Sequence, residues 1–202
     1  FKQTTVPTEL ATVSVASVSA GEYHTCAVTS AGAVQCWGNN GNGRIDVPTA
    51  LATGGVASVS AGWTHTCAVT SEGAVQCWGN NDSGQTSVPA ALATGGVASV
   101  SAGGGHTCAV TSAGAVQCWG HKDYGQTSVP AELAMGGVAS VSAGVAHTCA
   151  VTSAGAVQCW GDNVFKQTTV PTELATVSVA SVSAGGASHL RGNQRGRCAV
   201  LG

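Results

Sequence analysis

The chain has 202 residues, of which 8% are charged, and its net charge is −2. This length is enough for one domain with a real core, and the low charge disfavours a nucleic-acid partner, which requires a basic face. The sequence contains no apolar run of about 18 residues, so no membrane insertion is expected.

The chain begins with a short piece, residues 1–7, that ends in Val6-Pro7. The same dipeptide returns at a fixed interval, at Val47-Pro48, Val88-Pro89, Val129-Pro130 and Val170-Pro171. A fixed period of roughly 40 residues is typical of propellers, solenoids and arrays. A proline in this position ends strand pairing or marks an edge. The residues that follow it, such as 90–95, are expected to form a turn, and no helix is predicted.

Each unit continues with an apolar strand and then a hairpin. The strands are expected at residues 13–21, 56–62, 97–103, 138–144 and 179–185. The first hairpin, 24–38, reads HTCAVTSAGAVQCWG, and it recurs almost unchanged at 65–79, 106–120 and 147–161. Its two alternating halves are separated by three residues that end in Gly32, a favoured connection because glycine tolerates a positive φ.

The hairpin register places the two cysteines of each unit opposite one another. Val28 then faces Val34 and Cys26 faces Cys36, as a non-hydrogen-bonded pair with Cα atoms about 4.5 Å apart, at the short end of the disulfide range. A zinc or redox site is the alternative, but such sites favour closer C-x-x-C spacing. One cross-strand disulfide per unit is predicted: Cys26–Cys36, Cys67–Cys77, Cys108–Cys118 and Cys149–Cys159.

Three strands per unit, with a short fourth before the proline, predict an all-β propeller. Four complete blades are expected at about 13–48, 54–89, 95–130 and 136–171, within a single repeat domain that spans 1–202. A partial terminal blade would combine residues 177–202 with 1–7. Paired cysteines favour an oxidising compartment, so the chain is expected to be secreted or on the cell surface, as a mature form or an excerpt.

The end of the sequence departs from the repeat. Residues 165–185 are identical to residues 1–21, but eight extra residues then precede Cys198-Ala199-Val200. Cys198 is the odd cysteine and is expected to be unpaired, as a free thiol or in an intermolecular bridge. The basic residues of this tail are interpreted as a solvated loop.

The repeated histidines and tryptophans receive structural interpretations. His24, His65, His106 and His147 are expected to bond a backbone group inside their own blades, although a symmetric ring of histidines could also meet a metal. The tryptophans, Trp37 and its three counterparts, are predicted to pack the blades. No set of nucleophile, base and orienting residue can be assembled, so no enzyme activity, metal site or cofactor is expected.

Two windows of each unit vary while the hairpin does not. The first precedes the His-Thr-Cys triplet and the second follows the Trp-Gly pair. Both are expected to be loops, where binding residues commonly lie on a rigid scaffold; drift in exposed loops is the alternative. Aromatic residues are frequent interface anchors. The candidate partner-binding residues are therefore Tyr23, Trp63, Tyr124 and Phe165.

The hairpin resembles the repeat of the regulator-of-chromosome-condensation (RCC1-like) β-propeller family. The matching residues are His24-Thr25, Ala27-Val28, Gly32, Val34 and Trp37-Gly38, followed later by Asp123–Gln126. Segments such as 84–90 and 166–173 are similar to those of the secreted bacterial β-lactamase inhibitory proteins of type II. That resemblance implies a seven-bladed propeller that presses one rim against an enzyme. Seven blades with this period would need more than 202 residues, so residues 1–7 would close a five-bladed ring, or the blades form an open arc, or the ends join between molecules.

Three functions follow as hypotheses. The chain is a non-enzymatic protein-binding or structural scaffold whose identical segments allow head-to-tail self-assembly into extracellular fibres. It is alternatively a β-lactamase-type enzyme inhibitor that uses the variable rim. Guanine-nucleotide exchange activity is the third hypothesis, disfavoured because the disulfides place the chain outside the cell.

Overall fold

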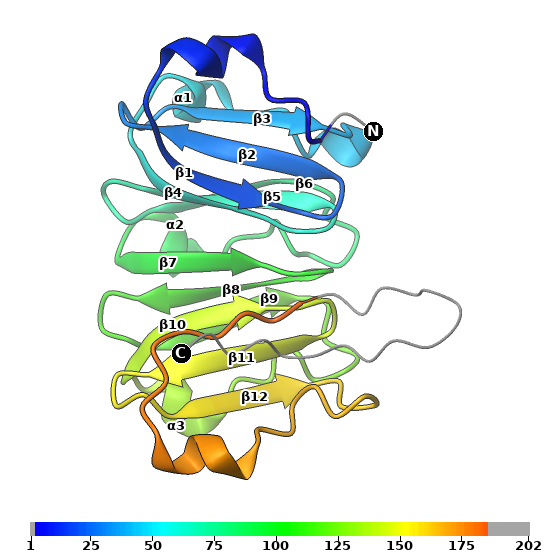
Figure 1. Cartoon of the computed structure of the whole chain (residues 1–202), viewed down its shortest axis with the longest axis vertical. Coiled ribbons are helices and arrows are strands. Elements are labelled where there is room, and N and C mark those ends of the chain that lie inside the picture. The colour runs from blue at the N-terminus through cyan, green and yellow to red at the C-terminus, as the bar shows by residue number, and fades with distance from the viewer. Residues whose placement is uncertain (1–2, 186–202) are drawn as a thin grey trace.

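The computed structural model describes residues 3–185, so the predictions for Cys198 and for the basic tail lie outside the described residues. Four three-stranded antiparallel sheets, which we call blades 1 to 4, follow one another along the chain. Figure 1 shows them as a stack with the first and last sheets at opposite ends. The predicted all-β, propeller-like architecture is therefore confirmed.

Each blade is a meander of three strands. Blade 1 holds β1 (Val15–Ala20), β2 (His24–Thr29) and β3 (Val34–Gly38), and blade 2 holds β4 (Val56–Ala61), β5 (His65–Thr70) and β6 (Val75–Gly79). Blade 3 holds β7 (Val97–Ala102), β8 (His106–Thr111) and β9 (Val116–Gly120). Blade 4 holds β10 (Val138–Ala143), β11 (His147–Thr152) and β12 (Val157–Gly161). Within residues 3–185 no fourth strand precedes the prolines, so that expectation was wrong.

The hairpin register is the predicted one. Val28 faces Val34 and Cys26 faces Cys36, and Gly32 has a φ of +79°. The four predicted disulfides are confirmed, with Cα–Cα distances of 4.0–4.1 Å. Each sulfur pair therefore closes its own hairpin.

The first strand of each blade contains a bulge that its sequence does not announce. In blade 2, Val56 pairs with Thr70 but Ser58 pairs with Val69, so Ala57 is an extra residue. An extra residue changes which side chains share a face. As a result Val56 and Val59 both pack into one apolar cluster, although they are three positions apart.

The core lies between the blades rather than inside them. The cluster between blades 1 and 2 joins Val28 and Val34 of one blade to Ala68 and Trp78 of the next. Equivalent clusters join blade 2 to blade 3 and blade 3 to blade 4. The predicted packing role is thus confirmed for Trp78, Trp119 and Trp160, whose side chains are buried.

Short helical turns follow the Val-Pro pairs, where only turns were expected. They are α1 (Thr49–Ala52), α2 (Ala90–Ala93) and α3 (Ala131–Ala134), and the 3₁₀ turns η1 (Thr8–Thr12) and η3 (Thr172–Thr176). A further 3₁₀ turn, η2, spans Gly41–Gly43. The prediction of no helix was wrong at these positions because proline pre-sets the first turn and one leucine, such as Leu51, becomes buried under the blade edge. None of the described helices is long and apolar enough to cross a membrane.

The two ends of the stack differ from its middle. Residues 3–7 lie against blade 1, where the Gln3 carbonyl accepts hydrogen bonds from Thr25 and Trp37. Residues 177–185 lie along blade 4 and contain no strand, only one isolated β-bridge at Ser183. Residues 3–185 therefore form an open stack, while the predicted terminal blade of residues 177–202 with 1–7 lies partly outside the described residues.

Candidate protein-binding edge

Both variable windows lie on the same edge of the stack. The amide of Asn39, at the start of the second window, donates to the Tyr23 carbonyl in the first window at 2.9 Å. The same bond joins Asn80 to Thr64, His121 to Gly105 and Asp162 to Ala146. We call this the loop edge: residues 22–23, 63–64, 104–105 and 145–146 together with 39–46, 80–87, 121–128 and 162–169.

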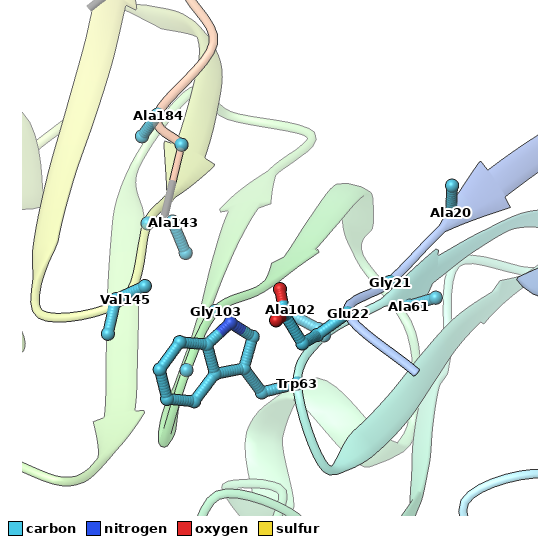
Figure 2. Close-up of a pocket in the computed structure, with 14 residues that line it drawn as sticks. Ala20, Gly21, Glu22, Ala61, Trp63, Ala102, Gly103, Ala143, Val145 and Ala184 are labelled. Atoms are coloured by element: carbon cyan, nitrogen blue, oxygen red, sulfur yellow. The ribbon is translucent and has the colours of Figure 1, made fainter. Parts of the chain in front are cut away.

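A pocket opens at the inner side of the loop edge. Its volume is about 240 Å³, and residues at the ends of β1, β4, β7 and β10 and directly after them form most of its wall. Figure 2 shows the side chains of Glu22, Trp63 and Val145 that line it. The pocket thus combines a carboxylate with an aromatic and an aliphatic surface.

The four candidate aromatic residues are all on the loop edge, but they are not in one cluster. Trp63 is half-buried in the pocket, whereas Tyr23, Tyr124 and Phe165 are 38%, 57% and 61% exposed and do not line it. Partner binding by these residues remains a prediction.

Arg44 is a residue of the loop edge that sequence reasoning did not single out. Its guanidinium is buried, donates to the Trp63 carbonyl at 3.0 Å, and lies 5.5 Å from the centre of the Tyr23 ring. Burial lowers the pKa of this guanidinium, while Tyr23 opposes that shift. Arg44 therefore fixes the loops of two adjacent blades. The sequence does mark this position: Arg44 replaces a glutamine that stands at the same place in the other repeats, at Gln3, Gln85, Gln126 and Gln167.

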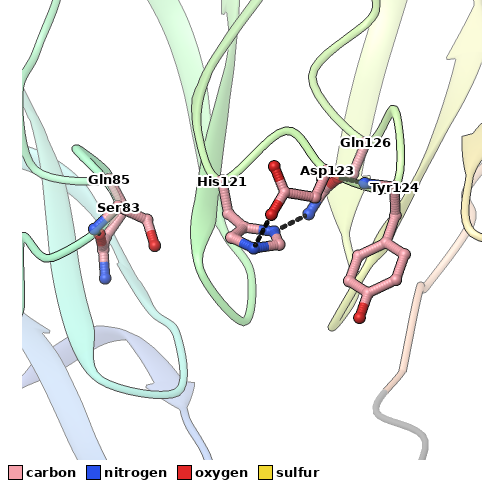
Figure 3. Close-up of polar contacts among 6 residues, drawn as sticks. All are labelled: Ser83, Gln85, His121, Asp123, Tyr124 and Gln126. Atoms are coloured by element: carbon pink, nitrogen blue, oxygen red, sulfur yellow. Dashed lines mark hydrogen bonds and ion pairs between the residues drawn. The ribbon is translucent and has the colours of Figure 1, made fainter.

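The loop after β9 holds its own polar cluster (Figure 3). The side-chain oxygen of Gln126, Oε1, accepts from the backbone amide of Tyr124, so the side-chain NH₂ group of Gln126 donates to Nδ1 of His121 at 2.7 Å. The remaining ring proton is then on Nε2, which lies 3.4 Å from Asp123. Ser83 lies in the neighbouring loop, but both nitrogens of His121 are already engaged, so the ring is not placed to act as a base on that serine.

The buried histidines connect blades, which corrects the expectation that each bonds a backbone group of its own blade. Nε2 of His65 lies 2.9 Å from the Thr107 hydroxyl, and that hydroxyl lies 2.9 Å from the Gln85 carbonyl. Because the carbonyl can only accept, the hydroxyl donates to it and accepts the Nε2 proton of His65. Trp119 donates to the same carbonyl. His24 and His106 bond Thr66 and Thr148 in the same way.

The histidine rings are held neutral. Burial lowers the pKa of His24 to about 4, with a smaller effect of Arg44, and that of His65 to about 3, with smaller effects of His106 and His24. The pKa of His106 falls to about 4 for the same main reason. Among residues 3–185 no group of three or more potential ligands could hold a metal ion, so the histidines do not form a metal ring there.

Replacing Thr107 with valine is expected to lower the free energy of unfolding by about 2–3 kcal/mol, because the buried Nε2 proton of His65 loses its acceptor. Thr25 is the matched control, since within residues 3–185 its hydroxyl bonds the Gln3 carbonyl and no histidine, and Thr25→Val should cost about 1 kcal/mol. Urea titrations followed by tryptophan fluorescence measure both losses. Equal losses in the two variants would contradict the relay.

Comparison with known proteins agrees with this geometry. The family model described as the regulator of chromosome condensation (RCC1) repeat matches residues 15–44, 56–85, 97–126 and 138–167. A sequence comparison with the curated proteins found no match.

Solved structures show the same fold. Human WBSCR16 has a TM-score of 0.71 at 19% identity, covering 87% of this chain and 58% of its own. Prp20p from Saccharomyces cerevisiae has a TM-score of 0.70 at 19% identity, covering 87% of this chain and 55% of its own. The ectodomain of the Physcomitrella patens receptor kinase CR4 has a TM-score of 0.62 at 28% identity, covering 85% and 45%. The chain therefore spans about half the length of these relatives.

Proposed function

Because this chain belongs to the regulator of chromosome condensation (RCC1) repeat family, we propose that it is a non-enzymatic, extracellular scaffold that binds a protein partner through the loop edge. One observation carries the proposal. Both variable windows meet on one edge, directly hydrogen-bonded to each other, above hairpins that scarcely change. A constant scaffold that presents variable loops on one edge is a common arrangement for binding.

The chemistry of the loop edge favours a protein over a nucleic acid. Its aromatic side chains are spread over blades 1 to 4, and the sequence as a whole is slightly acidic. Exposed tyrosine, tryptophan and phenylalanine provide large contact areas with few rotatable bonds. Among the similar structures, Prp20p is described with binding to Gsp1p and histones, and in complex with Kap60, so this fold can bind proteins.

Two observations support an extracellular location. The four disulfides indicate an oxidising environment. The similar structures at 25–28% identity include the ectodomains of two plant receptor kinases. Exchange of guanine nucleotides on an intracellular GTPase fits these observations less well than binding outside the cell.

Replacing Tyr23 and Trp63 together with alanine is expected to weaken partner binding roughly 1,000-fold, since aromatic anchors of this kind each contribute about 2 kcal/mol. The partner is isolated from extracellular extracts on the immobilised full chain and measured by surface plasmon resonance. A panel of β-lactamases is assayed in parallel for inhibition.

Met135→Ala is the matched control for this experiment. Met135 is 87% exposed, lies beyond α3 and precedes Gly136, which is next to the hairpin turn at Ala113 on the opposite edge of the stack. Its replacement should leave affinity unchanged. A partner that binds the double variant as tightly as the wild type would rule out the loop edge.

A structural role in self-assembly is a second candidate, favoured by the identity of residues 1–21 and 165–185. Identical segments at the two ends of an open stack allow a head-to-tail contact that need not close, and such contacts produce filaments. Low charge offers little resistance to association. Light scattering across a concentration series tests this role, and a constant single-chain mass would contradict it.

A further inference from the structure

Two segments of identical sequence each make half of the contacts that such a segment makes in the middle of the stack. We call residues 1–21 the leading segment and residues 165–185 the trailing segment. In the middle of the stack, the segment one repeat after the leading segment, which includes β4, contacts the preceding blade on one side. On its other side it pairs with the hairpin of its own blade. Each of the two end segments makes one of these contacts.

The leading segment pairs with its hairpin, but none of the blades within residues 3–185 lies in front of it. Its strand β1 pairs with β2, and the amide of Ser30 donates to the Ser14 carbonyl at 2.8 Å. Val18 is 61% exposed and Val15 is 39% exposed, whereas Val56, which is equivalent to Val15, is only 4% exposed. The other face of β1 is therefore apolar and uncovered.

The trailing segment contacts the blade in front of it but pairs with no described hairpin. The Val179 amide donates to the Gly155 carbonyl at 2.9 Å, and the Ala184 amide donates to Ser142 at 2.9 Å. Val56 and Ala61 make the same two bonds to blade 1. Residues 177–185 thus lie where a first strand belongs, but within residues 3–185 no second strand pairs with them.

We propose that the trailing segment of one molecule replaces the leading segment of a second molecule and pairs with the second molecule's β2. This exchange rests on the proposed role in self-assembly and specifies how it occurs. The two segments are identical in sequence, so each contact of the leading segment with β2 and β3 is available to the trailing segment. The trailing segment begins four whole repeats after the leading segment, so the blades continue in step across the joint.

The joint also completes a core cluster that is only half formed in one molecule. Val157 and Leu174 are half-buried, whereas the equivalent Val34 and Leu51 are buried in the cluster between blades 1 and 2. Trp37 of the second molecule is likewise half-buried, in contrast to Trp78. Exchange places these three side chains in one interface with the composition of the three existing clusters.

The hydrogen bonds at the joint match as well. Thr25 and Trp37, which now donate to the Gln3 carbonyl, would donate to the Gln167 carbonyl of the neighbouring molecule. His147 would then reach the Thr25 hydroxyl, as His24 reaches Thr66. His147 meets no such threonine within residues 3–185, so the exchange extends the relay by one step.

A substitution at Ser181 can distinguish pairing with β2 from attachment to blade 4. Ser17 is opposite Val28 in the pairing of β1 with β2. The Thr29 amide donates to the Ala33 carbonyl across the hairpin, so the backbone N–H and C=O of Val28, the adjacent residue, point toward β1. The equivalent Ser181 would use its amide for pairing with a second molecule. Within residues 3–185 the amides of Val179 and Ala184 attach the trailing segment to blade 4, so a proline at 181 leaves these two bonds intact and blocks the exchange.

The test compares one substitution at two identical sites of the full chain, by light scattering over a concentration series. Ser181→Pro should raise the concentration needed for assembly roughly tenfold or more, since a buried acceptor is left unpaired, while Ser181→Ala should assemble like the wild type. Ser17→Pro should assemble at lower concentration than the wild type, because it weakens the leading segment and leaves the trailing segment intact.

The outcomes separate the mechanism from the role. If the wild type assembles and Ser181→Pro assembles equally well, exchange is wrong and self-assembly stands. If the wild type remains a single chain throughout, both are wrong. An unchanged or weakened assembly of Ser17→Pro, with its four disulfides verified by mass spectrometry, also overturns the exchange.

Discussion

Lowering the pH from 6.5 to about 4 is expected to remove most of the stability of the stack. In the unfolded chain each histidine binds a proton below a pKa of about 6.5, whereas burial keeps the pKa of His24 and His106 at about 4 and that of His65 at about 3 in the folded chain. Because the folded pKa is depressed, the histidines favour folding fully above pH 6.5 and lose this contribution as the pH falls. The loss is roughly 3 kcal/mol for each ring, comparable in sum to the stability of a typical domain.

The physical reason is the closed environment of each ring. Nε2 already donates to a threonine of the next blade, and Nδ1 of His24, His65 and His106 is buried with no hydrogen-bond partner within the described residues. A second proton on Nδ1 would therefore be both buried and unpaired. The other charges near these rings are Arg44 and the neighbouring histidines, which also disfavour protonation.

The measurement is the urea midpoint as a function of pH, followed by circular dichroism. His106→Gln keeps an N–H donor but cannot titrate, so its stability should fall less steeply between pH 6.5 and 4. Lys122→Gln, an exposed substitution in the loop after β9, is the control and should retain the wild-type slope. A wild-type midpoint that stays constant over this range would contradict the prediction.

The local structure of each blade was predictable because it is encoded within a single hairpin, such as residues 24–38. The loop ending in Gly32 fixes the register of the hairpin, and the register places Cys26 opposite Cys36. Both steps use only neighbouring residues and known turn geometry. The fixed period of the sequence then extended the result to every blade.

Features that depend on packing between blades could not be predicted in this way. The bulge at Ala57 brings Val56 and Val59 into one cluster, a gain that exists only when the next blade is in place. The partner of His65 is a threonine 42 residues away, and no local pattern indicates it. The α1 turn spans four residues, too few for a helical period to be visible in the sequence.

The loop edge was predictable in part. Variation among the repeats identified both windows, but their meeting on one edge follows from the three-strand meander and the bond between Asn39 and Tyr23. The contribution of Arg44 was missed because a charged residue in an exposed-looking loop was not expected to be buried.

Replacing Gly103 with alanine is expected to disrupt the inner side of the stack and to cost about 3 kcal/mol or more. A Cβ atom at this position would overlap the Gly144 carbonyl of the next blade and lie 2.8 Å from Cε1 of His106. The carbonyl accepts the Gly104 amide, which is one of the bonds that join adjacent blades at the pocket, so it cannot move without breaking that bond. The His106 ring is fixed by Thr148.

Gly185 provides the matched control, since it is two repeats further along the chain and a Cβ atom there would meet no atom of residues 3–185 within 4 Å. Gly185→Ala should leave the free energy of unfolding within about 0.5 kcal/mol of the wild type. Urea denaturation of the two variants under oxidising conditions measures the difference. Because the substitutions are chemically the same and only the following blade differs, a large loss at Gly103 with none at Gly185 assigns the loss to contact between blades. Equal stability of the two variants would mean that adjacent blades can separate at Gly103 without cost, which contradicts the close approach of Gly103 to the Gly144 carbonyl.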